Sequence, residues 1–401
     1  MFVSIGYSDN PGSAVAGRQA AVEALSKNTL QGPCSIILLF ATARHDAGVL
    51  LTQIQAVFGP DVPVVGGGAV GVICNDRFGY AGDQVALAAF WLDDSGYELL
   101  VETGLDQGEE RVGERLGSRL KELGIKENSP LVLFYDAIDV SNGAMRMVMA
   151  THLLRSMENS LGFLPDIVGA GLMGDYACTP TPQWTGQGTA LHSALAVAFT
   201  GNVVMDHVIM HGCRPATSYY TVTRADGQTI LEINGQPALD FLNSMLESAI
   251  PVESYPFFLI LGVNRGDKWG EFDENSYANR LCLAIDKERG GIVMFEPDMV
   301  AGTEFQVMYR SLALDYMAPR IEEAFTRAKD RTPVFAMYID CAGRAAGYGG
   351  VDMEDAVMVQ KTIAGRVPLL GMYTGVEIAR VETAPRGLDW TGVFCLFSIP
   401  K

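Results

Sequence analysis

The sequence is short of positive charge. Its 401 residues include 29 Lys and Arg against 47 Asp and Glu, which gives a formal net charge of −18. A nucleic-acid surface needs a basic face to neutralise phosphates, and an anionic membrane surface attracts basic segments. The composition therefore argues against nucleic-acid and membrane partners. With 48% hydrophobic and 19% charged residues, the chain is typical of a protein with a large buried core.

Long hydrophobic runs and paired cysteines are also missing. No apolar stretch reaches the roughly 18 residues that a membrane span needs. The first residues, MFVSIGYSDNPGS, lack the basic and apolar regions of a secretory signal peptide. The seven cysteines are odd in number and scattered, and none forms a CxxC pair. Reduced thiols and a cytoplasmic location are the simplest interpretation.

Predicted strands and helices alternate in the first half of the chain. The glycine-rich strand PVVGGGAVG (63–71) resembles DIVGAGLMG (166–174), about 103 residues further on. The elements around the two strands recur in the same order, including a helix that the spacing predicts over 141–162 with Ser141 as N-cap. We therefore predict an internal duplication of a β-α-β-β unit, over about 28–110 and 125–205.

The pattern changes near residue 213. A β-hairpin over 217–235, which turns at Asp226-Gly227, is followed by further strands and helices without the repeat. We therefore predict two domains, 1–213 with the duplication and 214–401 with a second α+β arrangement. The predicted fold class is mixed α/β, with layered β-sheets flanked by helices.

Two glycine motifs, GGGAVG (66–71) and GAGLMG (169–174), match the dinucleotide-binding fingerprint. That fingerprint requires a helix directly after the loop, because the helix N-terminus binds the pyrophosphate. Here turn and strand residues follow both motifs, so no nucleotide cofactor is predicted. Gly66, Gly67 and Gly68 either allow another backbone to approach closely or form the rim of a ligand site.

His207, His211 and Cys213 form a His-x3-His-x-Cys pattern. On a helix the two imidazoles would share a face and could bind zinc. The surrounding Val, Ile and Met residues favour a strand, which would separate the imidazoles by about 13 Å. No metal is therefore predicted.

Three charged or nucleophilic residues lie at the ends of predicted C-terminal strands. Cys341 has Arg344 nearby, and an adjacent guanidinium lowers a thiol pKa, so a reactive thiolate is one interpretation. Glu377 lies among apolar residues, where a carboxylate needs a partner. Arg344 is the expected partner and Arg265 the second choice. Such a pair could be structural or could clamp a polar ligand.

Several segments in this order resemble the FIST family (F-box and intracellular signal transduction). They are VPVVGGGAVG (62–71), HGCRPATSYYTVTRADGQTILEINGQPALDFL (211–242), GGIVMFEPDMVAGTEFQVM (290–308), IDCAGR (339–344) and VPLLGMYTGVEIA (367–379). The resemblance covers nearly the whole chain and divides it into FIST N-terminal and C-terminal domains. It implies a sensory module that binds small ligands such as amino acids and often accompanies a signalling output domain. Because this chain has no room for such a domain, we expect its signalling partner to be a separate protein.

The positions that match the family's C-terminal motifs are the candidate ligand-binding residues. They are Cys341, Gly343, Arg344, Gly371, Tyr373 and Glu377, to which we add Arg265 and the three glycines 66–68. The first functional hypothesis is a cytoplasmic, non-catalytic sensor of a small polar ligand. The second is a protein-interaction scaffold without a ligand, and the third is an enzyme with Cys341 as nucleophile.

Overall fold

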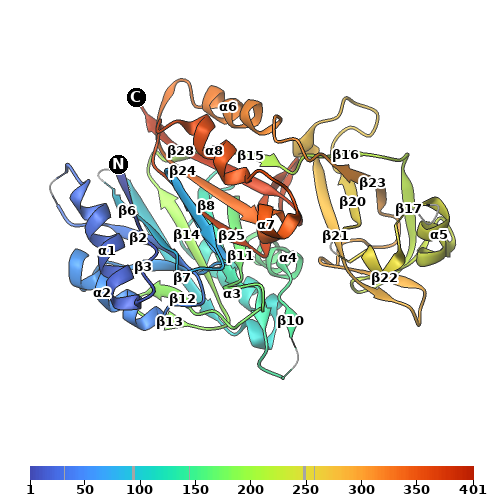
Figure 1. Ribbon diagram of the computed structural model, residues 1–401, viewed down its shortest axis with the longest axis horizontal. Coiled ribbons are helices and arrows are strands. Elements are labelled where there is room, and N and C mark those ends of the chain that lie inside the picture. The colour runs from blue at the N-terminus through green and yellow to red at the C-terminus, as the bar shows by residue number, and fades with distance from the viewer. Residues whose placement is uncertain (31, 93–94, 144, 247–249, 257) are drawn as a thin grey trace.

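The computed structural model describes residues 1–401 except 31, 93–94, 144, 247–249 and 257. It is a mixed α/β fold, as predicted, with three six-stranded sheets and a separate β-rich module (Figure 1). No described helix is long and apolar enough to cross a membrane.

The first sheet has the strand order β1-β6-β2-β3-β12-β13. Two helices cover its outer face, where alternate strand residues pack against their apolar sides. The strands are β1 (Phe2–Ser8), β2 (Ile36–Ala41), β3 (Val64–Gly68), β6 (Val85–Trp91), β12 (Gln183–Gly186) and β13 (Thr189–Ala190), and the helices are α1 (Ser13–Ser26) and α2 (Ala47–Phe58).

The second sheet has the order β7-β14-β8-β11-β26-β27. Its outer face is covered in the same way. The strands are β7 (Gly96–Thr103), β8 (Pro130–Asp136), β11 (Asp166–Leu172), β14 (Ser193–Thr200), β26 (Val376–Val381) and β27 (Ala384–Leu388), and the helices are α3 (Glu109–Glu122) and α4 (Ala150–Leu161).

The third sheet has the order β15-β28-β24-β25-β4-β5, again with helices outside. Its strands come from both halves of the sequence, so the position 213 does not separate the sheets. The strands are β4 (Gly71–Cys74), β5 (Arg77–Tyr80), β15 (Val204–Met210), β24 (Arg331–Cys341), β25 (Leu369–Thr374) and β28 (Gly392–Pro400), and the helices are α6 (Met317–Arg327), α7 (Ala346–Gly349) and α8 (Asp355–Ile363).

The three sheets are three copies of one unit. The inner faces of all three contribute to one central core, which includes Phe40, Phe134 and Phe335. Each sheet has one parallel pair at its centre, β2–β3, β8–β11 or β24–β25. The sequence predicts two of these units and misses the third, and the predicted bounds are shifted. The first unit also contains β1 and α1, which precede residue 28, whereas β7, within 28–110, belongs to the second sheet.

Each unit passes a hairpin to another unit. The hairpin β4–β5 of the first unit pairs with β25, β12–β13 of the second unit pairs with β3, and β26–β27 of the third unit pairs with β11. The exchange is cyclic, so every sheet is completed by a segment from elsewhere in the chain. Unfolding one unit therefore removes two strands from a neighbouring sheet.

A β-rich module of residues 213–310 is inserted between β15 and α6, at one end of the molecule (Figure 1). The carbonyl of Gly212 accepts a hydrogen bond from the Ser311 N–H at 2.9 Å, so the two ends of the module are adjacent. Its elements are β16 (Cys213–Pro215), β17 (Tyr220–Asp226), β18 (Thr229–Ile233), β19 (Gln236–Pro237), α5 (Ala238–Met245), β20 (Ile260–Asn264), β21 (Tyr277–Asp286), β22 (Gly291–Met294) and β23 (Glu304–Arg310).

The predicted helix over 141–162 begins later than expected. Residue 144 lies outside the described residues, and short strands β9 (Ile138–Asp139) and β10 (Arg146–Met147) precede α4. The first two N–H groups of α4 donate to the Glu296 carboxylate at 3.1 and 2.9 Å. This cap comes from the inserted module, so Ser141 is not the N-cap, and no local pattern could reveal Glu296.

Four short 3-10 helices complete the secondary structure of the described residues. They are η1 (Leu105–Gln107), η2 (Val252–Ser254), η3 (Glu274–Ser276) and η4 (Ala342–Arg344). The last of them follows β24 directly and brings the IDCAGR segment to the seam between the three-sheet body and the module.

Candidate functional site

A cavity of about 160 Å³ lies at the seam between the three-sheet body and the inserted module. Cys341 ends β24 and Thr374 ends its parallel neighbour β25, and both line the cavity. Ligand sites in α/β proteins commonly lie outside the carboxyl ends of parallel strands. The module contributes Leu281, Leu283 and Phe295 to the opposite wall. Neither part of the chain forms the cavity alone.

Aromatic side chains form part of the wall. The rings of Tyr176 and Tyr348 are stacked, with centroids 4.9 Å apart and an interplanar angle of 6°. Trp390 is buried, and the Arg310 guanidinium lies 4.8 Å from the centroid of its ring. The backbone of Trp390 has φ +54°, which is costly for a bulky residue and is enriched at functional sites.

Sulfur-containing side chains form another part of the wall. Met145, Met147, Met173, Cys178 and Cys341 all line the cavity. The thiol of Cys178 lies 3.8 Å from the Met173 sulfur. Thioethers are polarizable and flexible, so such a wall adapts to the shape of an apolar ligand.

Asp389 is the one charged side chain that the described cavity lining contains, and Lys, Arg and His are absent from it. Asp389 is 3% exposed. Its Oδ2 accepts from the Leu281 N–H at 3.0 Å, whereas Oδ1 has no partner within the described chain. Burial raises the pKa of Asp389 to about 7, although Arg280 opposes the shift and Glu296 adds to it. An unpartnered buried carboxyl oxygen is costly and indicates a missing donor.

Two of the predicted site residues, Cys341 and Gly343, line this cavity. The structure does not favour a reactive Cys341 thiolate, which is one interpretation of the sequence. Burial raises the pKa of the thiol well above its usual value, and the nearby Glu377 charge raises it further. Arg344 does not compensate, because its guanidinium is engaged elsewhere.

Arg344 lies in a buried network of its own. Its Nε lies 3.2 Å from Asp340 Oδ1 and 3.1 Å from Asp355 Oδ2. Its other donors reach the His211 carbonyl and the Tyr316 hydroxyl, both at 2.9 Å. These contacts occupy the guanidinium, and Arg344 does not belong to the cavity lining.

The expected pairing of Glu377 with an arginine does not form. Glu377 is fully buried, and its Oε2 accepts from the Thr391 N–H at 3.3 Å. Its Oε1 has no partner within the described chain, and burial holds the pKa of this carboxyl well above its usual range. Arg265, the second choice, lies 3.6 Å from Asp298 instead. Glu377 is therefore a buried carboxyl group without an arginine partner.

The remaining predicted site residues lie in packed surroundings. The Tyr373 hydroxyl donates to Glu354 at 3.0 Å, and its ring packs edge-on against Tyr80. A Cβ at Gly67 or Gly68 would lie 2.6 Å from Leu172 or 1.7 Å from Thr181. None of these residues, nor Gly66 or Gly371, lines the cavity. A ligand role for these residues stays a prediction, and their position outside the cavity lining does not support it.

The two histidines of the His-x3-His-x-Cys pattern have separate partners. His207 lies on β15 with its Nε2 3.3 Å from the Arg380 carbonyl. His211 Nδ1 accepts from the Cys213 N–H at 2.9 Å, and burial lowers the pKa of His211 to about 4. Their contacts are those of core histidines.

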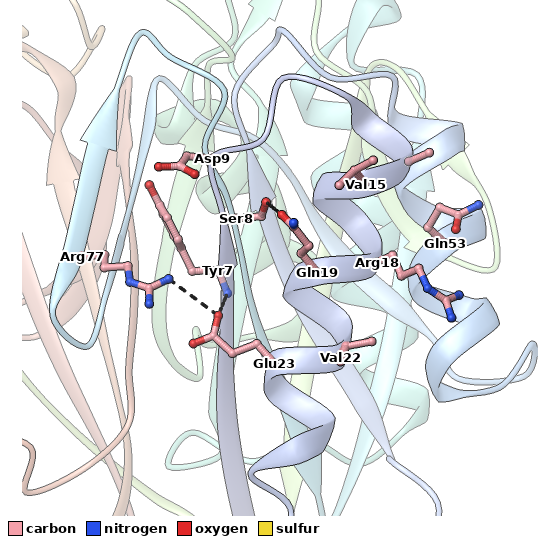
Figure 2. A pocket seen from close by; sticks show the side chains of 11 residues that line it. Tyr7, Ser8, Asp9, Val15, Arg18, Gln19, Val22, Glu23, Gln53 and Arg77 are labelled. Carbon is pink, nitrogen blue, oxygen red and sulfur yellow. Dashed lines mark hydrogen bonds and ion pairs between the residues drawn. The ribbon is translucent and has the colours of Figure 1, made fainter.

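A second hollow lies on the outer face of α1, next to the free edge of β1 (Figure 2). Its polar groups are engaged with one another. The Glu23 carboxylate accepts from the Tyr7 N–H at 2.9 Å and lies 3.8 Å from Arg77, and the Ser8 hydroxyl donates to Gln19 at 2.7 Å. Figure 2 shows Arg18 and Val22 directed away from this network. These contacts protect the sheet edge from pairing with another chain.

Sequence reasoning missed most of the cavity lining. Tyr176 lies in a loop and Tyr348 in the short helix α7, and their pairing depends on tertiary structure. The segment RGLDWTG (386–392) did carry a signal, because it places an acid and a tryptophan between two apolar strands. The same argument that singled out Glu377 applies to Asp389.

Comparison with known protein sequences shows the family to which the chain is related. The profile of the FIST N domain matches residues 35–236 and that of the FIST C domain matches residues 238–380. An uncharacterised protein of Mycobacterium bovis is 29% identical over 193 residues, which are 47% of this chain and 50% of the relative. An uncharacterised protein of Mycobacterium tuberculosis is 29% identical over 177 residues, which are 43% of this chain and 46% of the relative.

The chain spans about half the length of these curated relatives. This partial sequence identity does not by itself indicate an activity for the chain. The two profiles together cover most of the chain, including much of the body and all of the module but residue 237. The chain therefore belongs to the FIST family, whose domains are generally sensory modules of signal transduction.

Proposed function

We propose that this protein is a non-catalytic sensor that binds one small ligand in the cavity between the body and the module. The observation that carries the proposal is that both parts line the same cavity. The unpartnered Asp389 Oδ1 and the strained Trp390 backbone support it, because both features cost stability in the empty protein. Cys341 and Gly343 are the ligand contacts that the sequence predicts.

The signal in this proposal is a change in how the module docks. Three groups of hydrogen bonds hold the module to the body beside the cavity. Glu296 caps α4, Asp389 accepts from Leu281, and Arg280 donates to the Gly387 carbonyl at 2.9 Å. A ligand that contacts both parts binds the docked state better than an undocked one and shifts the equilibrium towards it.

The surroundings of Cys341 favour a sensor over an enzyme. A nucleophilic cysteine needs a lowered pKa or an adjacent base. Cys341 has a raised pKa, and carboxyl groups rather than a histidine are its charged neighbours. The cytoplasmic location and the separate signalling partner stay predictions, as does the alternative of an interaction scaffold.

A thermal-shift screen tests the proposal. The purified protein is screened against amines, amino acids, organic acids and neutral aromatic compounds. A ligand at about 100 times its dissociation constant stabilises the folded state by about 2.7 kcal/mol, which raises the unfolding midpoint by a few degrees. We expect a selective shift with at least one of these classes.

A cavity-blocking variant gives the screen its control. A Cβ at Gly375 meets its neighbours at 3.6 Å or more, so Gly375→Leu fits the backbone and fills the cavity. Leu283→Trp blocks it from the module side. Gly188→Leu, in a turn elsewhere, is the matched control. A shift that survives both blocking variants, or no shift with any class, contradicts the proposed function.

A further inference from the structure

The charge of the cavity restricts the ligand. A buried anion needs a cationic or strongly donating partner. The described lining contains no Lys, Arg or His, and its one ionisable acid is Asp389. Arg344 and Arg280, which lie nearby in the fold, are engaged with Asp355 and Asp298. Arg310 lies over the Trp390 ring and donates to the Gly349 carbonyl at 3.3 Å, outside the cavity lining. A ligand carboxylate or phosphate would therefore meet no cationic side chain in the described lining.

Carboxyl groups surround the cavity from behind its wall. Glu377 and Asp340 both act on the Cys341 thiol from within electrostatic range. The whole chain carries a formal charge of −18. This net negative charge attracts cations to the protein and repels anions, and neither Glu377 nor Asp340 offers an anion a counter-charge. The Tyr176 and Tyr348 rings also line the cavity, and aromatic rings attract cations.

The size and walls of the cavity restrict the rest of the ligand. Its volume is about 160 Å³, and an apolar cavity of about 150 Å³ binds one benzene molecule. Phe295, Leu281 and the methionine thioethers offer contacts to an apolar body. The ligand body is therefore about the size of one ring.

We propose that the ligand is a small organic amine, with a ring-sized apolar body in the cavity and a protonated nitrogen that binds the Asp389 carboxylate. This inference rests on the proposed function and specifies its ligand class. The ammonium group would donate to Asp389 Oδ1, the atom without a partner, while Oδ2 keeps its bond from Leu281. An amine without a carboxylate fits this lining better than an amino acid does.

Proton release is a consequence of this binding mode. Burial holds the pKa of Asp389 at about 7, and a bound ammonium favours the charged carboxylate. Binding below pH 7 therefore displaces a proton, so affinity rises with pH by up to tenfold per unit below pH 7 and levels off above it. The ionisable groups that act on Asp389 or respond to it are Arg280, Glu296, Asp298, Glu377 and Tyr135.

Isothermal titration with three matched probes tests the ligand class. The probes are 2-phenylethylamine, 2-phenylethanol and phenylacetate, which share a ring and differ in the head group. We expect the amine to bind most tightly and phenylacetate to give no measurable heat. In Asp389→Asn, which keeps an acceptor for the Leu281 N–H, amine affinity falls at least tenfold. In Asp240→Asn, at an exposed site on α5, it is unchanged.

Three outcomes overturn the inference. The first is that phenylacetate binds as tightly as the amine. The second is that the amine affinity is unchanged in Asp389→Asn. The third is that amines from propylamine to 2-phenylethylamine give no heat at about 10 mM, a concentration ten times a dissociation constant of 1 mM. Binding of the alcohol or the acid that Gly375→Leu abolishes leaves the proposed function standing and removes only the amine class. Because the Asp389→Asn substitution could alter the fold, proton release by the wild-type protein in two buffers gives an independent reading.

Discussion

At the scale of single residues, buried charge separates structural groups from candidate functional ones. Arg344 has its donors occupied by Asp340, Asp355, a carbonyl and a hydroxyl. Asp389 has one oxygen occupied and one without a described partner. A side chain with its hydrogen bonds made stabilises the fold, whereas one that lacks a donor next to a cavity points to a ligand.

Replacing Arg344 with Ala is expected to destabilise the protein by about 3–5 kcal/mol, because Asp340 and Asp355 remain buried without a counter-charge. Arg224→Ala is the control, since its pair with Glu232 is exposed and is worth at most about 1 kcal/mol. Urea denaturation measures both. Equal losses for the two variants would show that the Arg344 network does not hold the fold.

Asp389→Asn is expected to alter how stability depends on pH. The pKa of Asp389 rises from 3.8 in the unfolded chain to about 7 in the folded protein. Proton binding by Asp389 therefore favours the folded state. This contribution to the free energy of unfolding is complete below pH 3.8 and is lost as pH rises through 7. The wild type should therefore lose stability relative to the variant between pH 5 and pH 8. Denaturation at both pH values checks this, and parallel pH profiles would contradict the raised pKa.

At the scale of elements, the glycine-containing strands β3, β11 and β25 explain why two repeated units could be predicted from the sequence and the third could not. Gly66 and Gly169 revealed two units because their surroundings are similar and only about 103 residues apart. Gly371 occupies the same position in a third unit, but the inserted module interrupts that unit between β15 and α6. A Cβ at Gly66, Gly169 or Gly371 would lie 2.1, 2.0 or 2.3 Å from a carbonyl oxygen of the neighbouring parallel strand.

Gly169→Ala is therefore expected to destabilise the protein by about 1–3 kcal/mol or more, because β8 must move away from β11. Gly375→Ala, whose Cβ has room at 3.6 Å, should change stability little. Thermal unfolding of the two variants measures the difference. If both variants unfold at the wild-type temperature, close strand approach is not the reason for this glycine.

The site was less predictable than the fold for a physical reason. Cys341 and Gly343 lie where a strand ends, and strand ends can be read from the sequence. The partners of Arg344 and Glu377 depend on which strands the exchanged hairpins join, and no local pattern contains that information. Asp389 could have been predicted from the sequence, because RGLDWTG (386–392) places an acidic residue between two apolar strands.

At the scale of the whole molecule, the site lies where the repeated body meets its one inserted module. The cyclic exchange of hairpins makes the three sheets interdependent, whereas the module enters and leaves at adjacent residues. Motion of the module is thus compatible with an intact body. A ligand at the seam would contact both the interdependent body and the inserted module, as the proposed sensor requires.

Methionine methyl NMR tests the central claim, that ligands bind at this seam, most directly. Of the 17 methionines, Met145, Met147 and Met173 line the cavity, and Met205 lies in the central core. On titration with 2-phenylethylamine and 2-phenylethanol, we expect the methyl resonances of the three cavity methionines to shift with at least one probe. In Gly375→Leu we expect these ligand-induced shifts to disappear. Shifts confined to other methionines, or unchanged by Gly375→Leu, would contradict this claim.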